Sequence, residues 1–337
     1  MSVFFDVYGL RIRVGGDWAE VIEAVRLDFA WFEASDDGRE PAVEVLVENA
    51  EADLDCFGAL PAAFVTPRYA VFGDRERTVV DYQGLAAAVI ERDGSAITVR
   101  GRQEEVAHEA AYYFLLGRIG RHLDAEGLVR VHALGLSGDR GGIVVLLPSS
   151  GGKSTLALQA LARGEGRLLS EDSPLLDRDG RLHAFPLRIA VGARTAAALP
   201  NRPVRSLPNP AAGHKLAVEV SMFVSQIEPA PQPLRHIVLG VRSLGRESTL
   251  EERPRRAAVL PLLMHGVVGA GLYQGLGYAH QRGAGELLAK VVVAAGRARS
   301  CAAALQHAEV WQLTLGRDPE KSWQALRSLL MEAPGRS

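Results

Sequence analysis

Lysine and cysteine are both scarce in this sequence. The 337 residues contain two cysteines, Cys56 and Cys301, which lie far apart and form no CxxC pair. This count excludes a disulfide framework, so we expect a protein of the reducing cytoplasm whose two thiols are buried as small apolar side chains. Only four of the 38 basic residues are lysines, at positions Lys153, Lys215, Lys290 and Lys321. Each lysine therefore stands out against an arginine-rich background.

Neither sign of charge is in excess. Lys and Arg total 38 against 40 for Asp and Glu, which gives a net charge of −2. No basic run alternates with aromatic residues. We therefore expect no nucleic-acid partner.

Long uncharged apolar runs are missing, except over residues 257–279. The N-terminus has no basic segment followed by a long apolar stretch, so we expect no signal peptide. Residues 257–279 carry no charged side chain and exceed the ~20 residues that cross a bilayer. They also contain Pro261, His265, Gln274 and five glycines. We therefore expect a buried helix starting near Pro261 and then a glycine-rich turn, and no membrane span.

The rest of the composition, 47% hydrophobic and 23% charged, is that of a globular protein. Residues 1–102 are short β-rich runs separated by Gly, Asp or Asn, and they predict a β-rich α+β domain. One helix is predicted over residues 20–33, and a hairpin is predicted to turn at Asp93-Gly94. Residues 103–128 predict a connecting helix that stops at Gly127.

The pattern changes in residues 129–337, which predict an α/β domain. A strand at 129–137 precedes an apolar strand at 143–148, a loop that enters a helix, and an apolar strand from 167 with acids near its middle. This order is typical of a nucleotide-binding unit. Residues 197–214 hold four prolines and predict a long loop. A later strand is predicted at 235–245, and the C-terminal third is predicted mostly helical, with a last helix around 321–332.

One segment carries the strongest chemical signal, Leu147-Pro-Ser-Ser-Gly-Gly-Lys-Ser-Thr155. A phosphate-binding loop needs inward-facing backbone N–H groups, an ammonium for the outer phosphates and a hydroxyl for Mg²⁺. Two glycines would supply the turn, Lys153 the ammonium and Ser154 the hydroxyl, at the positive end of the following helix. The predicted nucleotide-binding residues are Ser149, Ser150, Gly151, Gly152, Lys153, Ser154 and Thr155. Leu147 stands where the standard motif has its first glycine.

Two acids follow the next apolar strand. Glu171 and Asp172 come directly after Leu168-Leu169-Ser170, so we expect them at the carboxyl end of the strand adjacent to the loop strand, where ligands of open α/β sheets bind. Because side chains alternate along a strand, we expect only one of the two acids to face the nucleotide. His132 lies in the strand before the loop, where it is either a proton relay near the γ-phosphate or a core histidine with satisfied hydrogen bonds.

In order and spacing, these residues resemble the HPr kinase/phosphorylase family. Its catalytic domain has a His-Gly-type strand, a short Gly-x-Ser-Gly-x-Gly-Lys-Ser loop and a strand that ends in Ala-Asp-Asp. The matching segments here are Val131-His132-Ala133, Ser149–Ser154 and Ser170-Glu171-Asp172. The resemblance covers about residues 129–190 and looks closest to precursor-peptide kinases of the lasso-peptide type. The chain departs from the pattern at Leu147, Ser150 and Glu171.

The resemblance implies a fold and a set of roles. The fold would be a P-loop α/β domain of the HPr kinase and PEP-carboxykinase type, joined to the β-rich N-terminal domain. Lys153 and Ser154 would bind ATP and Mg²⁺. Asp172, with Glu171 second, would be a metal ligand or the base that activates the acceptor hydroxyl, and His132 would assist. The sequence has no Asn-Lys-x-Asp guanine signature.

The sequence therefore predicts an ATP- and Mg²⁺-dependent kinase that phosphorylates a hydroxyl, such as a serine of a peptide or small protein. Two alternatives stay open: a kinase of a small-molecule hydroxyl, and a nucleotide-binding regulator without transfer activity, which the Leu147 departure motivates. Arg188, Arg194 and Lys215 flank the proline-rich loop and are candidate cations for substrate or transferred phosphate. A homo-oligomer is compatible with the sequence.

Overall fold

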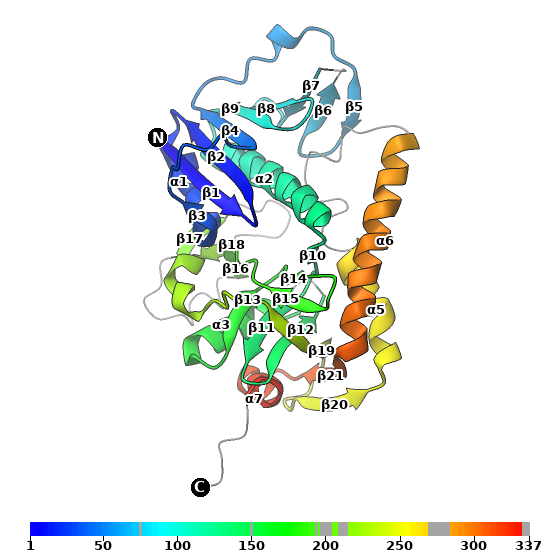
Figure 1. Ribbon diagram of the computed structural model, residues 1–337. Helices are drawn as coiled ribbons and strands as arrows, with labels where there is room; N and C mark the ends of the chain where they lie inside the picture. Colours follow the sequence, from blue (N-terminus) through cyan, green and yellow to red (C-terminus); the bar gives the residue numbers. More distant parts are fainter. Residues whose placement is uncertain are drawn as a thin grey trace. The chain divides into compact units, whose positions relative to one another are not determined.

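The computed structural model describes residues 1–73, 76–148, 151–192, 195, 204–207, 215–268 and 284–331 (Figure 1). The protein is of the mixed α/β kind, with two large mixed sheets and one small one. It forms two compact units. The first unit is Met1–Leu123 together with Tyr273–Leu288, and the second is Asp124–Leu272 together with Ala289–Ser337.

The first unit is built on a nine-stranded sheet in the order β3-β1-β2-β4-β9-β8-β7-β6-β5. Alternating buried valines along its strands, as at Val43, Val45 and Val47, give the sheet one core-facing side. The strands are β1 Ser2–Val7, β2 Leu10–Gly16, β3 Glu33–Ala34, β4 Val43–Glu48, β5 Ala62–Val65, β6 Ala70–Gly73, β7 Arg77–Asp81, β8 Ala86–Glu91 and β9 Ala96–Gly101. The helices are α1 Ala19–Asp28, α2 Glu104–Glu126 and the short 3-10 turns η1 Ala30–Phe32 and η2 Asp55–Phe57.

Several predictions for this region are confirmed. Strands β8 and β9 form the antiparallel hairpin expected around Asp93-Gly94, and Gly94 has a φ of 68°. α1 and η1 fill most of the range expected to be helical, and α2 ends just before Gly127, whose φ is 78°. These positive φ values explain why glycine stands in the hairpin turn and directly after the helix.

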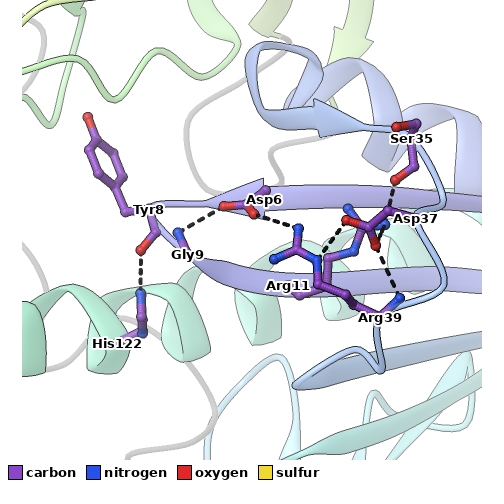
Figure 2. Close-up of polar contacts among 8 residues, drawn as sticks. All are labelled: Asp6, Tyr8, Gly9, Arg11, Ser35, Asp37, Arg39 and His122. Carbon is purple, nitrogen blue, oxygen red and sulfur yellow. Dashed lines mark hydrogen bonds and ion pairs between the residues drawn. The ribbon is translucent and has the colours of Figure 1, made fainter.

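A polar network fixes the first hairpin of this unit (Figure 2). Tyr8 and Gly9, with φ of 53° and 88°, make the tight turn between β1 and β2, and the ring of His122 on α2 lies 2.9 Å from the Tyr8 carbonyl. Asp37 pairs with two arginines, Arg11 at 3.2 Å and Arg39 at 2.7 Å. The network therefore ties the segment after β3 to the hairpin.

The second unit contains another nine-stranded sheet, in the order β10-β14-β15-β19-β12-β11-β13, with β21 beside β19 and β20 beside β21. Its strands are β10 Val129–Arg130, β11 Leu134–Gly138, β12 Gly141–Leu146, β13 Arg167–Ser170, β14 Leu175–Leu176, β15 Arg181–His183, β19 Gln232–Arg242, β20 Thr249–Arg253 and β21 Glu309–Leu315. A separate three-stranded sheet holds β16 Ile189–Gly192, β17 Val204–Leu207 and β18 Lys215–Val218. The helices are α3 Lys153–Arg163, η3 Val220–Gln226, η4 Arg255–Ala258, α5 Val259–Leu263, the π-helical η5 Met264–Val268, α6 Ala284–His307 and α7 Pro319–Leu330.

Four strands of this sheet end at one edge. β12 is parallel to β19, and β19 is parallel to β21. β13 is antiparallel to β11, which is antiparallel to β12, so β13 and β12 run in the same direction. The segments that follow β12, β13, β19 and β21 therefore emerge on the same side, where open α/β sheets bind ligands.

Some predicted elements differ from the structure. The strand expected at 129–137 is two strands, β10 and β11, because the intervening N–H groups bond elsewhere: Val131 to Pro174, His132 to His265 and Ala133 to Asp172. β13 is not adjacent to β12, since β11 lies between them. The long loop expected over residues 197–214 contains β17, and its remaining residues lie outside the described part of the chain.

The C-terminal third is less helical than predicted, because β20 and β21 extend the sheet there. Within the segment 257–279, helix α5 starts at Val259 rather than Pro261, and the expected glycine-rich turn falls outside the described residues. None of the helices in the described ranges combines the length and the apolar character needed to cross a membrane. Cys301 is buried as expected, but the prediction for Cys56 is wrong, because this residue is exposed.

Candidate functional site

The phosphate-loop motif joins β12 to α3 in the second unit. All six residues of β12 are buried, so the loop leaves the sheet from a rigid strand. Gly152 directly precedes α3 with a φ of 113°, a left-handed conformation that favours glycine. The Gly151 N–H donates to the Pro148 carbonyl at 2.9 Å. Ser149 and Ser150 lie outside the described residues.

The first turn of α3 is open to an anion. No described side chain caps this helix, whereas Asp318 caps α7 by accepting the Glu320 N–H at 3.0 Å. The first N–H groups of a helix have no partner within it, and they lie at its positive end. The backbone of Lys153, Ser154 and the half-buried Thr155 therefore offers donors to a phosphate.

Leu147, which stands where the standard motif has its first glycine, packs against the neighbouring strand. Its side chain is fully buried and lies against Gly240 on the neighbouring strand β19. A Cβ placed on Gly240 would come within 2.3 Å of Leu147 Cδ2. The leucine thus fills the space that this glycine leaves open.

Lys153 is only 6% exposed, and three acceptors surround its ammonium. Nζ lies 3.0 Å from Nε2 of His132, 3.2 Å from the carbonyl oxygen of Leu147 and 3.4 Å from Oδ1 of Asp172. The first two contacts are hydrogen bonds and the third is an ion pair, so the ammonium, which has three donors, keeps one for a further acceptor. The Lys153 ammonium therefore lies next to the Leu147 carbonyl and beside the Asp172 carboxylate.

His132 connects the lysine to the second acid. Because Lys153 can only donate, Nε2 of His132 accepts from it, and the ring proton then resides on Nδ1. Nδ1 lies 3.2 Å from Oδ1 of Asp172, within ion-pair distance of that carboxylate. Asp172 is 47% exposed, so one face of this linked group is accessible to a substrate.

Glu171 contacts the loop hydroxyl. Oγ of Ser154 donates to Oε1 of Glu171 at 2.6 Å and lies 3.4 Å from the carbonyl oxygen of Ala190 on β16. Burial, and then the neighbouring Asp172 carboxylate, raise the pKa of Glu171 to about 7 against the lowering effect of the Ser154 hydrogen bond. A cation beside Glu171 would stabilise its ionised form.

Both acids contact residues at the start of α3, so the strand alternation from which we expected only one to face the nucleotide does not apply to them. β13 ends at Ser170, so Glu171 and Asp172 lie beyond the strand and do not follow its alternation. Glu171 contacts Ser154, and Asp172 contacts Lys153 and His132. The structure thus brings together the predicted residues His132, Lys153, Ser154, Glu171 and Asp172.

His265 belongs to the same cluster, and sequence reasoning gave it no role. Its ring stacks on that of His132 at 5.7 Å, and its Nδ1 donates to the His132 carbonyl at 2.6 Å. Burial lowers the pKa of His265, which favours this neutral form. Gly266 beside it packs closely on Cys301 of α6. The one available signal was a histidine in an otherwise apolar, uncharged segment.

The predicted additional cations are only partly placed. Arg188 is half-buried just before β16, two residues from the Ala190 carbonyl that Ser154 approaches. The Lys215 backbone begins β18, but its side chain lies outside the described atoms, as does all of Arg194.

The donors in this cluster fit Mg²⁺. The described residues contain no group of three or more His, Cys, Asp or Glu arranged as a ready metal cage. Mg²⁺ does not need one, since it is usually held by one or two carboxylates together with substrate phosphates and water. The Ser154 hydroxyl and the Glu171 carboxylate are hard oxygen donors already 2.6 Å apart, which suits this ion.

Comparison with protein-family models and with curated proteins finds no match for this chain.

Proposed function

We propose that this protein is an ATP- and Mg²⁺-dependent phosphotransferase that acts on a hydroxyl group. The observation that carries the proposal is the joining of Lys153, His132 and Asp172 to the Ser154–Glu171 pair at the open start of α3. An ammonium, a hydroxyl–carboxylate pair and a second, accessible carboxylate are the groups that phosphoryl transfer requires. The finer fold we propose is the HPr-kinase-like P-loop fold that the sequence motifs resemble.

Each group has a role set by its position. The backbone at the start of α3 would bind the phosphates, and Lys153 would neutralise charge on the outer two. Ser154 and Glu171 would hold Mg²⁺, whose chemistry when bound is charge neutralisation on the β- and γ-phosphates. Glu171, rather than Asp172, takes the metal in this assignment because it is the acid on Ser154.

Asp172 would accept the proton of the acceptor hydroxyl. Its side chain is 47% exposed, and Nδ1 of His132 lies 3.2 Å from its carboxylate. Lys153 also lies 3.4 Å from Oδ1, so the carboxylate is held beside a positive charge at the place where an acceptor hydroxyl would approach. We propose a serine hydroxyl of a peptide or small protein as the acceptor class, in line with the resemblance of the motifs.

Lys153→Ala and Asp172→Asn test these roles separately. We expect Lys153→Ala to weaken ATP binding and to lower transfer by about 10³-fold, as loss of a phosphate-stabilising charge does. Asp172→Asn should keep ATP binding but lower kcat by about 10²- to 10⁴-fold, the range for loss of a general base. Transfer is measured by mass spectrometry of candidate peptides incubated with ATP and Mg²⁺.

The matched control is Lys321→Ala, which removes a half-buried lysine, 41% exposed at its side chain, that pairs with the exposed Glu247. It should leave binding and transfer unchanged. Full transfer by either site variant would refute the assignment. Tight ATP binding with no phosphorylated product from any hydroxyl substrate would instead support a regulator.

A further inference from the structure

We propose that Arg242 is a second phosphate-binding cation of this site, placed on the side of the loop opposite Lys153. The inference rests on the proposed function and extends it to a residue that no sequence motif marks. Arg242 is the last residue of β19, the parallel neighbour of the loop strand β12. Its position thus follows from the sheet topology.

The Arg242 side chain reaches the phosphate loop. A Cβ placed on Gly152 would lie 3.6 Å from Nη1 of Arg242, so the guanidinium borders the glycine that opens α3. Arg242 is exposed, and its guanidinium has no hydrogen bond or ion pair with any described residue. It is paired along the sheet with Leu315, the last residue of β21.

An unpaired cation at this place is electrostatically unfavourable. The start of a helix is its positive end, and cations are disfavoured there. Lys153, which directly follows Gly152, is a second cation at this place. Asp172 balances part of its charge. A phosphate bound at the start of α3 would relieve both effects, because it would lie between the helix end and the guanidinium.

The topology also indicates which phosphates Arg242 contacts. The sheet order is β13-β11-β12-β19, and the Lys153–His132–Asp172 group lies toward β11 and β13. Arg242 lies on the other flank, at the end of β19. If the transferred γ-phosphoryl group sits next to Asp172, Arg242 contacts the phosphates that stay with the nucleotide. Such a contact is equally strong before and during transfer, so it sets affinity and not rate.

The test measures equilibrium binding of Mg²⁺·ATP and of inorganic pyrophosphate to wild type and variants, together with kcat and KM. For Arg242→Ala we expect at least tenfold weaker binding of both ligands, a matching rise in the KM for ATP, and kcat within about twofold of wild type. Arg242→Lys should recover part of the loss, since it restores charge without the planar fork.

Two controls separate contact from general charge. Arg235→Ala removes an exposed arginine seven residues earlier on β19, about 23 Å from Arg242 along the strand. Arg246→Ala removes an exposed arginine in the loop after β19, at the same edge. Both should stay within about twofold of wild type for either ligand.

Unchanged binding in Arg242→Ala overturns the inference, as does an equal loss in Arg246→Ala, or a fall in kcat at constant KM. If the wild-type protein binds pyrophosphate through Arg242 but does not bind ATP, the proposed kinase activity is refuted. The assignment of Arg242 to an anion-binding site is then retained. Wild type that binds neither ligand refutes both.

Discussion

At the scale of single residues, Leu147 and Gly240 act as a matched pair. The leucine side chain occupies the space above the glycine on β19, and this contact holds the start of the phosphate loop against the sheet. The two contacting positions lie 93 residues apart in the chain, since 240 − 147 is 93. The start of the loop is therefore fixed by the packing of the Leu147 side chain against Gly240.

This pairing predicts non-additive substitutions. Leu147→Ala should cost about 3 kcal/mol of unfolding free energy, as burial is lost and a cavity forms. Gly240→Ala alone should also destabilise, because its Cβ would clash with Leu147. The double variant should be clearly more stable than the sum of the two effects predicts. Denaturant unfolding measures all three values.

Gly192→Ala is the matched control for an added methyl group, since nothing lies within 4 Å of its Cβ position. Its effect should be small and should add to that of Leu147→Ala. If the unfolding free-energy changes of Leu147→Ala and Gly240→Ala simply add in the double variant, the Leu147 side chain does not occupy the space that a Cβ at position 240 would need.

At the scale of elements, β19 carries a buried titratable group. His236 lies in the middle of the strand, and burial, aided by Arg140 and Arg235, lowers its pKa against the opposing effect of Glu309. The unfolded chain, with an ordinary histidine pKa near 6.5, then binds a proton more readily than the folded protein. Stability is full above this pKa and falls as the pH drops below it.

His236→Gln should therefore reduce the acid sensitivity of the fold. We expect the melting temperature of wild type to drop between pH 7.5 and pH 5.5, and the drop to be smaller in the variant. His307→Gln, at an exposed position on α6, is the control and should retain the wild-type drop. An equal drop in wild type and His236→Gln would mean that the proton is taken up elsewhere.

Local signals predicted the elements that depend on neighbouring residues. The sequence predicted the glycine pair, the lysine and the following helix of the candidate phosphate loop, because these features lie within one short segment. The break between β10 and β11 was not, because it depends on N–H groups bonding to Pro174, His265 and Asp172. Strand periodicity carries no information about such distant partners.

The same distinction applies to the site. The grouping of His132, Lys153, Glu171 and Asp172 could be predicted from order and spacing, but the separate contacts of the two acids could not. Those contacts depend on where β13 ends. His265 contacts His132, and Arg242 borders Gly152, each from a remote part of the chain, so no local signal marked either residue.

At the scale of the whole molecule, the candidate site belongs to one of the two units. The candidate site residues with described geometry all belong to the second unit, whereas the first has its own sheet and its own buried aromatic residues. The four tryptophans are divided equally, with Trp18 and Trp31 in the first unit and Trp311 and Trp323 in the second. Fluorescence can therefore follow each unit separately.

If the site binds Mg²⁺·ATP, the ligand should stabilise the unit that contains it. At a hundredfold excess over Kd, binding adds about 2.7 kcal/mol to the unfolding free energy of the binding unit. In a variant that keeps only Trp311 and Trp323, we expect the melting temperature to rise by several degrees. A variant that keeps only Trp18 and Trp31 should show a much smaller rise. Lys153→Ala should remove the effect in the first reporter, and equal shifts in both reporters would show instead that the units unfold as one.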